Sequence, residues 1–373
     1  MLALQPPAQD GTAAVHVMKR VKIGVVGCGA IAQVHHLPNL AALDEQFEVS
    51  VVCDVSPAAA ADAARRFHVP RHVTDWRDLL AADLDAVLLC HTDPKTEAAV
   101  AVLQAGKHLF IEKPVCFSLE EIDAMIAAQA DAGTVAQAGY MKVYDPAFEL
   151  ARQAVRDIDQ VRFVQVNHLH PDNALHLRQF DVRRFDDYPD EVLERTRAAR
   201  SASIRQAIGD AAPMVQRTFS LLSGSGIHDL YGLRVLLGVP NAVVSTEIWR
   251  AGRAVTFTLQ YPGGARCVAT WIDLPDLWDF RETLEVYGDR RRVLLSYPTG
   301  FARGILSRVV VHGTDERGSA FRTEPAVDWE SAFLRELRHF HECIAAGVPN
   351  RTPLAEARHD IELIIDIVGR YRG

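Results

Sequence analysis

Short apolar runs rich in β-branched residues alternate with alanine-rich stretches of helical periodicity from residue 22 to about residue 144. We predict strands at 22–27, 49–54, 86–90, 108–111 and 135–139. Between them, Ser56-Pro57 and Asp93-Pro94 each place an N-cap before a proline, and Ser118 opens a capping box with Glu121. Strands and helices that alternate in this way predict parallel βαβ units.

The pattern changes after residue 144. A predicted helix at about 145–156 leads to a strand at 161–167, a polar stretch over 168–215 and an apolar helix near 226–237. Strand-like runs follow at 242–250, 253–261, 265–273, 281–288, 291–296, 305–311 and 318–323, and helices at about 330–346 and 353–371 end the chain. Closely spaced strands favour antiparallel pairing. We therefore predict an α/β protein: an N-terminal Rossmann-like parallel sheet, then an α+β domain with a large, mostly antiparallel open sheet.

Composition agrees with two ordinary folded domains. The chain has 373 residues, of which 49% are hydrophobic and 24% charged, and this balance argues against disorder. We place a mobile tail at 1–17, the parallel-sheet domain at 18–144 and the second domain at 145–373, with a helical excursion at about 168–215. The net charge of −8 offers no positive field for nucleic acid or for an anionic membrane, so small molecules and further copies of the chain are the expected partners.

Cysteine spacing and hydropathy bear on location. The six cysteines stand singly with no C-x-x-C pair, which predicts neither a disulfide framework nor a thiolate zinc site. No apolar run approaches the 18 or so residues that cross a bilayer, and the N-terminus lacks a signal-peptide pattern. We expect a soluble protein of the cytoplasm.

A dinucleotide fingerprint follows the first predicted strand. It reads G-x-G-x-x-A, from Gly27 and Gly29 through Ala30 and Ile31 to Ala32, and it opens an apolar-periodic helix. The glycines permit a tight turn and a close approach of pyrophosphate to the backbone, and Ala32 permits close packing of helix on strand. Asp54 ends the second strand, where a carboxylate accepts hydrogen bonds from a ribose 2′-hydroxyl and repels a 2′-phosphate. The motif therefore predicts NAD as the cofactor, in preference to NADP.

Several further motifs resemble one family. AGKHLFIEKPV with Glu112-Lys113-Pro114, LCHTDP, GYMKVYDPAFE, GIHDLYGLRVLLG and FLRELRHFHECIAAGVPNRTP follow one another in the order typical of the glucose-fructose oxidoreductase and inositol dehydrogenase (Gfo/Idh/MocA) family. The resemblance covers roughly 22–167 and 216–373. It implies a two-domain oxidoreductase that acts on a hydroxyl of a sugar, sugar derivative or cyclitol, assembled as a dimer or tetramer through the open face of its second sheet.

The resemblance also implies roles for single residues. Lys113 matches the family's catalytic lysine and His228 its catalytic histidine, and both would contact substrate, while Thr92, Glu112 and Lys113 would lie against the cofactor. Hydride removal from a carbinol carbon needs a base for the hydroxyl proton and a group that stabilises the developing charge. A lysine in a desolvated cleft suits this task because burial lowers its pKa. Taken by itself, Lys113 would be read as a solvated surface lysine and His228 as a packed helix residue.

Two positions depart from the family pattern. Gly224 stands where many members carry an aspartate four residues before the histidine, and Glu97 stands where a histidine is frequent. Glu97, Asp229 or a residue of the 168–215 segment is therefore a candidate to orient His228. Lys142 occupies a place where the family often has Arg or Lys, and we expect Lys142 and Tyr140 to line the cleft between the domains and contact substrate.

The 168–215 segment has no counterpart in the resemblance. His168 and His170 would share one face of a strand, where they could contact sugar hydroxyls, serve structure, or with Asp172 and His176 bind a metal. Substrate contact is the favoured interpretation, and no metal is expected. The charged remainder predicts a solvated helical lid or oligomer contact.

Together these features favour an NAD-dependent dehydrogenase of a sugar, glycoside or cyclitol. A redox-neutral enzyme that oxidises a sugar, eliminates a glycosidic bond and returns the hydride would use the same equipment. A non-catalytic NAD sensor is the third reading, and the retention of Lys113 and His228 speaks against it.

Overall fold

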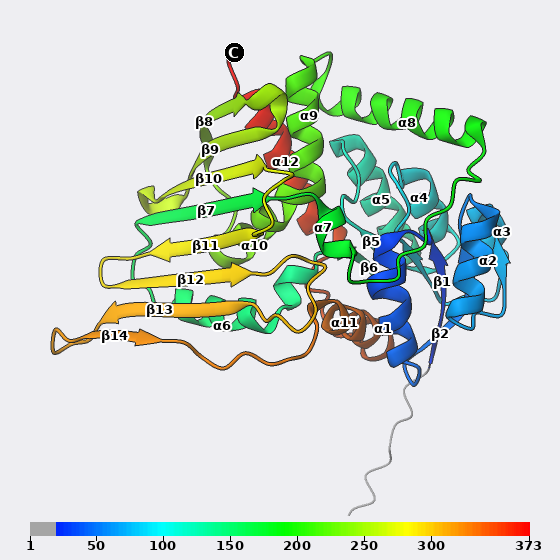
Figure 1. Ribbon diagram of the computed structural model, residues 1–373, viewed down its shortest axis with the longest axis horizontal. Helices are drawn as coiled ribbons and strands as arrows, with labels where there is room; N and C mark the ends of the chain where they lie inside the picture. Colours follow the sequence, from blue (N-terminus) through cyan, green and yellow to red (C-terminus); the bar gives the residue numbers. More distant parts are fainter. Residues whose placement is uncertain (1–19) are drawn as a thin grey trace, which may run out of the picture.

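The computed structural model describes residues 20–373, so the tail predicted at 1–17 lies outside the described residues. Two sheets lie side by side, each covered by helices, as Figure 1 shows. The parallel sheet comes from the first third of the chain and the larger sheet from the remainder, as the apolar patterns predict.

The parallel sheet has six strands in the order β3-β2-β1-β4-β5-β6, which is a Rossmann arrangement. Its strands are β1 (Val21–Val26), β2 (Phe47–Cys53), β3 (His72–Val73), β4 (Ala86–Leu89), β5 (His108–Glu112) and β6 (Ala136–Gly139). Its helices are α1 (Leu37–Ala42), which continues a π-helical turn (Ala32–His36), α2 (Pro57–Arg66), α3 (Trp76–Leu80), α4 (Thr96–Gln104) and α5 (Leu119–Ala132). The central strands are almost wholly buried, as expected where helices cover both faces.

Helix boundaries test the predicted caps. The side chain of Ser56 accepts the Ala59 N–H at the start of α2, and Ser118 and Glu121 form the complete capping box of α5. The cap predicted at Asp93 is wrong. The α4 helix begins at Thr96, and the Asp93 carboxylate instead pairs with the buried ammonium of Lys95.

The second sheet has eight strands in the order β14-β13-β12-β11-β7-β10-β9-β8. They are β7 (Phe163–His170), β8 (Ala242–Trp249), β9 (Ala254–Gln260), β10 (Arg266–Asp273), β11 (Arg281–Tyr287), β12 (Arg291–Tyr297), β13 (Arg308–Thr314) and β14 (Ala320–Thr323). All neighbours pair antiparallel except β7 and β10, which are parallel. Burial alternates along the central strands, so one face packs on helices.

Six helices and three short 3-10 turns belong to this second part or link it to the first. They are α6 (Pro146–Arg156), α9 (Pro213–Leu221), a π-helical turn (Leu222–Gly226), α10 (Ile227–Leu237), α11 (Ala332–Ala346), α12 (Leu354–Gly369) and the 3-10 turns Met141–Tyr144, Arg250–Gly252 and Pro262–Gly264. The α11 helix returns to the first domain, where Leu337 and Phe340 join the core formed by β1 and α1. The α12 helix packs on α5 and α10. None of the helices between residues 20 and 373 is both long and apolar enough to span a membrane.

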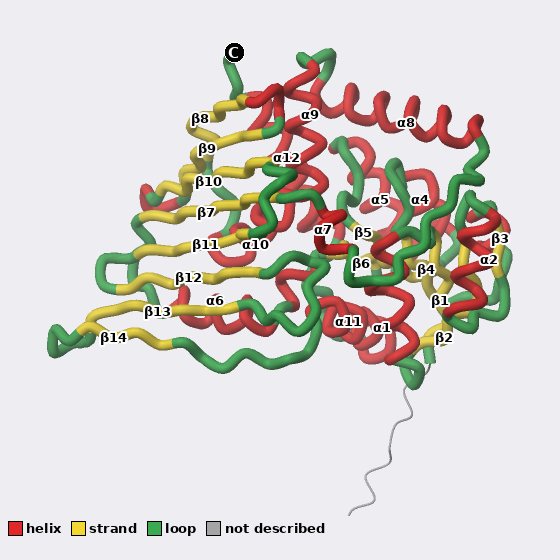
Figure 2. Tube along the Cα trace, in the orientation of Figure 1, coloured by secondary structure: helices red, strands yellow, loops and turns green. Residues whose placement is uncertain are grey.

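The segment predicted as a helical excursion at 168–215 is helical only in part. The β7 strand continues through His170, a short α7 (Asn173–Leu177) follows, and α8 (Asp190–Ile208) holds most of the helix. Between α7 and α8 the chain is extended and crosses the front of the first domain past α1 (Figures 1 and 2). In this stretch the polar side chains contact the first domain. These tertiary contacts override the helix-forming composition that led to the prediction of a helix.

Candidate active site

One cavity lies where the two sheets meet. The loops after β5 and β6 form one wall, the π-helical turn and α10 a second, and the ends of β7 and β11 a third. About 660 Å³ of space not filled by protein atoms, open solvent included, lies within the cavity. Seven of the residues predicted from sequence line it: Ile31, Glu112, Lys113, Lys142, His168, His170 and His228.

The fingerprint loop has the backbone geometry of a dinucleotide cradle. Gly27 adopts φ +98°, and a Cβ there would lie 2.5 Å from the backbone nitrogen of His91, so only glycine fits. At Gly29 a Cβ would meet nothing within 4 Å, which leaves the backbone open to a ligand. Ala30 and Ile31 begin the helix, and Ala32 is fully buried against the sheet. These residues fit a bound pyrophosphate.

Asp54 lies at the end of β2, beside this loop. Its carboxylate accepts the N–H of Cys28 at 2.8 Å and the N–H of Ser56 at 2.9 Å. Burial raises the pKa of Asp54, and these two donors oppose that rise. The remaining lone pairs are suited to ribose hydroxyls. Thr92, predicted beside the cofactor, lies exposed in the loop after β4.

Lys113 follows β5 directly and reaches across the cavity. Its Nζ donates to the carbonyl of Gly224 at 2.8 Å. A π-helical turn leaves carbonyls outside the regular ladder, which accounts for an acceptor in the middle of a helix. Burial lowers the pKa of Lys113, and the charges of Lys142 and Lys95 lower it further against the opposing effect of Glu112. Glu112 is itself held by His36 at 2.8 Å.

His228 occupies the first turn of α10. Its Nδ1 lies 2.7 Å from the hydroxyl of Tyr231, and that hydroxyl accepts the backbone N–H of Lys142 at 3.2 Å. Burial, together with the nearby lysines, lowers the pKa of His228 well below its ordinary value. Tyr231 therefore takes the orienting place for which Glu97 and Asp229 were candidates. Glu97 is exposed on α4 and pairs with Arg77 at 2.6 Å.

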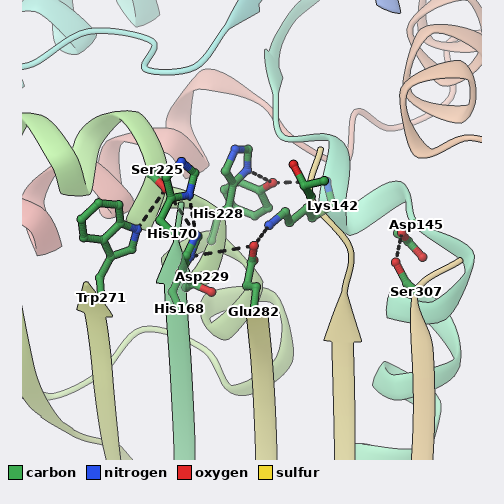
Figure 3. Close-up of polar contacts among 12 residues, drawn as sticks. Lys142, Asp145, His168, His170, Ser225, His228, Asp229, Trp271, Glu282 and Ser307 are labelled. Atoms are coloured by element: carbon green, nitrogen blue, oxygen red, sulfur yellow. Dashed lines mark hydrogen bonds and ion pairs between the residues drawn. The ribbon is translucent and has the colours of Figure 1, made fainter. Parts of the chain in front are cut away.

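A cluster of hydrogen-bonded polar side chains, drawn in Figure 3, contributes His168, His170, Lys142 and Glu282 to the lining of the cavity. Asp229 accepts from Nδ1 of His168 at 2.8 Å, and Nε2 of His168 lies 3.2 Å from Nδ1 of His170. Glu282 is the direct cross-strand partner of His168 and forms an ion pair with Lys142. Burial raises the pKa of Glu282, an effect that Lys142 opposes.

The same cluster offers three atoms that a metal ion could use. The ligand atoms of His168, Asp229 and Glu282 lie within 4.8 Å of one another. Glu282 is already paired with the Lys142 ammonium, and a cation bound beside that ammonium would be repelled. The arrangement suits hydroxyl groups, each of which donates and accepts a hydrogen bond.

Two outcomes go beyond the sequence. Tyr140 does not line the cavity: it is buried and stacks on Tyr231 with ring centroids 4.1 Å apart. Glu282 was missed, as was Ser225, which accepts from the indole of Trp271 at 3.0 Å. A signal for Glu282 existed, because it occupies the same alternating phase of β11 as the buried Leu284 and Val286.

Comparison with known proteins places the dinucleotide-binding part of the chain in a family. The family described as "Oxidoreductase family, NAD-binding Rossmann fold" (GFO_IDH_MocA) matches residues 21–140. Residues 21–140 therefore belong to the Gfo/Idh/MocA oxidoreductase family. The resemblance drawn from the sequence is confirmed over this part of the chain.

The relatives of this chain are distant. Uncharacterized oxidoreductase YrbE of Bacillus subtilis (strain 168) is 30% identical over 145 residues, which are 37% of this chain and 41% of YrbE. Inositol 2-dehydrogenase of Rhizobium meliloti (strain 1021) is 28% identical over 225 residues, 55% of this chain and 66% of the relative. The chain thus aligns with about half the length of these two proteins. Levoglucosan dehydrogenase, in complex with NADH and L-sorbose, shares the fold, with a TM-score of 0.73 and 18% identity over 94% of this chain and 96% of that one.

Proposed function

We propose that this protein is an NAD-dependent dehydrogenase that oxidises a secondary hydroxyl of a sugar, glycoside or cyclitol. The observation that carries the proposal is the position of Lys113 and His228, which face one cavity beside the dinucleotide cradle. A base and a hydrogen-bond donor on one reacting oxygen are what hydride removal from a carbinol requires. When bound, the nicotinamide supplies the hydride acceptor.

Lys113 takes the proton of the reacting hydroxyl. Its lowered pKa provides a neutral amine nearer to neutral pH than an ordinary lysine would. The Gly224 carbonyl accepts one N–H of the amine, which leaves its one lone pair free to accept the hydroxyl proton. Both residues are half-buried in the wall of the cavity.

His228 acts as a neutral donor in this scheme. The Tyr231 hydroxyl already accepts from the Lys142 N–H, so its own hydrogen is available for Nδ1 of His228. The imidazole then carries its proton on Nε2 and can donate it to the substrate oxygen. This division of roles assigns proton abstraction to Lys113 and charge stabilisation to His228.

The polar cluster recognises the other hydroxyls. His168, His170, Lys142 and Glu282 line the cavity with both donors and acceptors, and Phe280 and Phe333 add apolar surface for the ring carbons. Such a mixture suits a polyhydroxylated ring. The inositol 2-dehydrogenase relative and the sugar-bound fold neighbour support the same substrate class.

Cofactor choice follows from Asp54. Its carboxylate, held between two backbone N–H groups, presents acceptors to a ribose 2′-hydroxyl and a negative charge to a 2′-phosphate. NAD is the proposed cofactor. The substitution Asp54→Ser should reduce the difference in affinity by which the protein prefers NAD to NADP.

The proposal is tested with the purified full chain. NADH and NADPH are titrated by fluorescence, and a panel of sugars, glycosides and inositols is then incubated with NAD while NADH absorbance and keto product are measured. Equimolar NADH and ketone from one member of the panel is the expected result. Failure to bind either dinucleotide would reject the proposal, and tighter binding of NADPH would reject its cofactor assignment.

A further inference from the structure

A strap crosses the dinucleotide-binding side of the first domain. We use this name for residues 178–189, the extended stretch between α7 and α8 that Figures 1 and 2 show passing α1. The strap is attached to the fingerprint loop itself. The Gln33 side chain donates to the Cys28 carbonyl at 2.8 Å and to the Arg183 carbonyl at 3.0 Å, and it accepts the Arg183 N–H at 2.9 Å. One amide thus connects the cradle to the strap.

Further contacts connect the strap to α2. Arg183 forms an ion pair with Asp62 at 2.6 Å, and Arg66 donates to the Asp181 carbonyl at 3.1 Å. Together with the Gln33 contacts, these bonds join the strap to both helices that border the cofactor cradle. The position of the strap is therefore set by several polar contacts along its length.

Asp187 occupies the N-terminus of α2. One carboxylate oxygen accepts the Ser56 hydroxyl, and the other accepts the Ala58 N–H at 2.9 Å. Asp54 accepts the Ser56 N–H, so two carboxylates flank the same residue.

The donors that Asp187 uses are those a 2′-phosphate would need. The adenosine ribose of a dinucleotide lies at the end of β2, where Asp54 stands, and a phosphate on its 2′-oxygen would extend toward the first turn of α2. There, a serine hydroxyl and a free helix N–H are ordinary phosphate ligands. In this protein both are already bound to a carboxylate of the chain.

We propose that Asp187 is a second cofactor-selecting residue, which excludes NADP by occupying the 2′-phosphate donors with a negative charge. The inference rests on the proposed function, since it assumes that a dinucleotide binds the fingerprint loop. The 2′-hydroxyl of NAD carries no charge and is not repelled. Selectivity then comes from a segment more than a hundred residues away from the fingerprint in sequence.

Charge-conserving and charge-removing variants test the inference. We expect Asp187→Asn to lower the ratio of the NADPH and NADH dissociation constants by about 10- to 100-fold, because a like-charge contact is removed. Asp187→Glu keeps the charge and should keep the ratio. Asp186→Asn is the matched control, because Asp186 is the exposed neighbour on the strap and should leave the ratio unchanged.

The two dissociation constants are measured by fluorescence titration at low and at high salt, with thermal melting to show that each variant is folded. Salt should weaken the discrimination of the wild type and have less effect on Asp187→Asn. If the wild type binds neither dinucleotide, the proposed function fails. If NADH binds and Asp187→Asn leaves the ratio at the wild-type value, or if Asp186→Asn changes it equally, the inference on Asp187 is overturned.

Discussion

At the scale of single residues, Lys113 combines three properties: it is half-buried, it has a fixed acceptor, and its side chain lines the cavity. We predict that Lys113→Met lowers kcat by about 10²–10⁴, the usual range for loss of a positioned proton-transfer group. NADH affinity should stay nearly unchanged. Steady-state kinetics and NADH titration measure the two effects, and full turnover by the variant would contradict the assigned role. His228→Asn should reduce kcat in the same way but less.

The pKa of Lys113 has a direction that pH profiles can test. Only the neutral amine accepts a proton, so the rate of alcohol oxidation should rise with pH and level off above the Lys113 pKa. Because that pKa is lowered from the ordinary 10.5, the plateau should begin below pH 10.5. The reverse reaction needs the ammonium and should fall over the same range. If kcat/KM does not change with pH for either oxidation or reduction, this assignment is contradicted.

Asp229 is a positioning residue for His168. It holds Nδ1 at 2.8 Å, so that Nε2 faces His170 and the cavity. We predict that Asp229→Asn raises KM for the sugar or cyclitol about tenfold, the loss expected for a hydrogen bond to a charged group. The affinity for NADH should be retained. The rise of the oxidation rate with pH, which we assign to Lys113, should also be retained. A change in NADH affinity as large as the change in KM would indicate a purely structural role.

At the scale of elements, the strap borders the proposed cofactor cradle through its contacts with Gln33 and Ser56. Its contacts with Gln33, Asp62 and Ser56 should slow dissociation of a bound dinucleotide. We predict that replacing residues 178–189 by a Gly/Ser linker of equal length speeds NADH release by about tenfold, an effect on the dissociation rate. Stopped-flow displacement measures it. The α8 helix should remain docked on α5, since the Ser203 hydroxyl donates to Glu121 at 2.6 Å. An unchanged rate of NADH release would show that the strap has no role in holding the dinucleotide.

At the scale of the whole molecule, α11 packs on the core of the first domain and α12 packs on α5, so both helices connect the two sheets that border the cavity. The cavity would suit the proposed dehydrogenase and equally the redox-neutral glycoside-cleaving alternative. The two differ in whether the hydride leaves the sugar. We predict that a substrate deuterated at the oxidised carbon transfers deuterium to NADH that accumulates in amounts equal to the ketone.

Mass spectrometry of NADH and product measures this transfer, with the Lys113→Met variant as the matched control. Bond cleavage without net NADH, accompanied by solvent deuterium beside the transiently oxidised carbon, would establish the alternative. A protein that purifies with NAD in place and turns over without added cofactor would support the same conclusion.

Local patterns in the sequence determined the elements and the cradle. Alternation of apolar and polar residues located all the strands of the second sheet, because a half-exposed strand imposes that period on its own residues. The G-x-G-x-x-A turn and Asp54 are likewise local, since one strand, one turn and one helix build the cradle. The two-residue β3 was not found, because so short a strand has no period to detect.

Only the tertiary structure decided which side chains meet. His168 faces Glu282 because β7 and β11 pair in one register, and it faces Asp229 because α10 packs on that sheet. The Gly224 carbonyl reaches Lys113 only through a π-helical turn. The strap lies on α2 through ion pairs that no local period signals. Contacts between segments far apart in sequence depend on strand register and packing. Residue spacing in the sequence therefore indicates which residues are candidates for a site, and only the folded chain decides which of these residues contact one another.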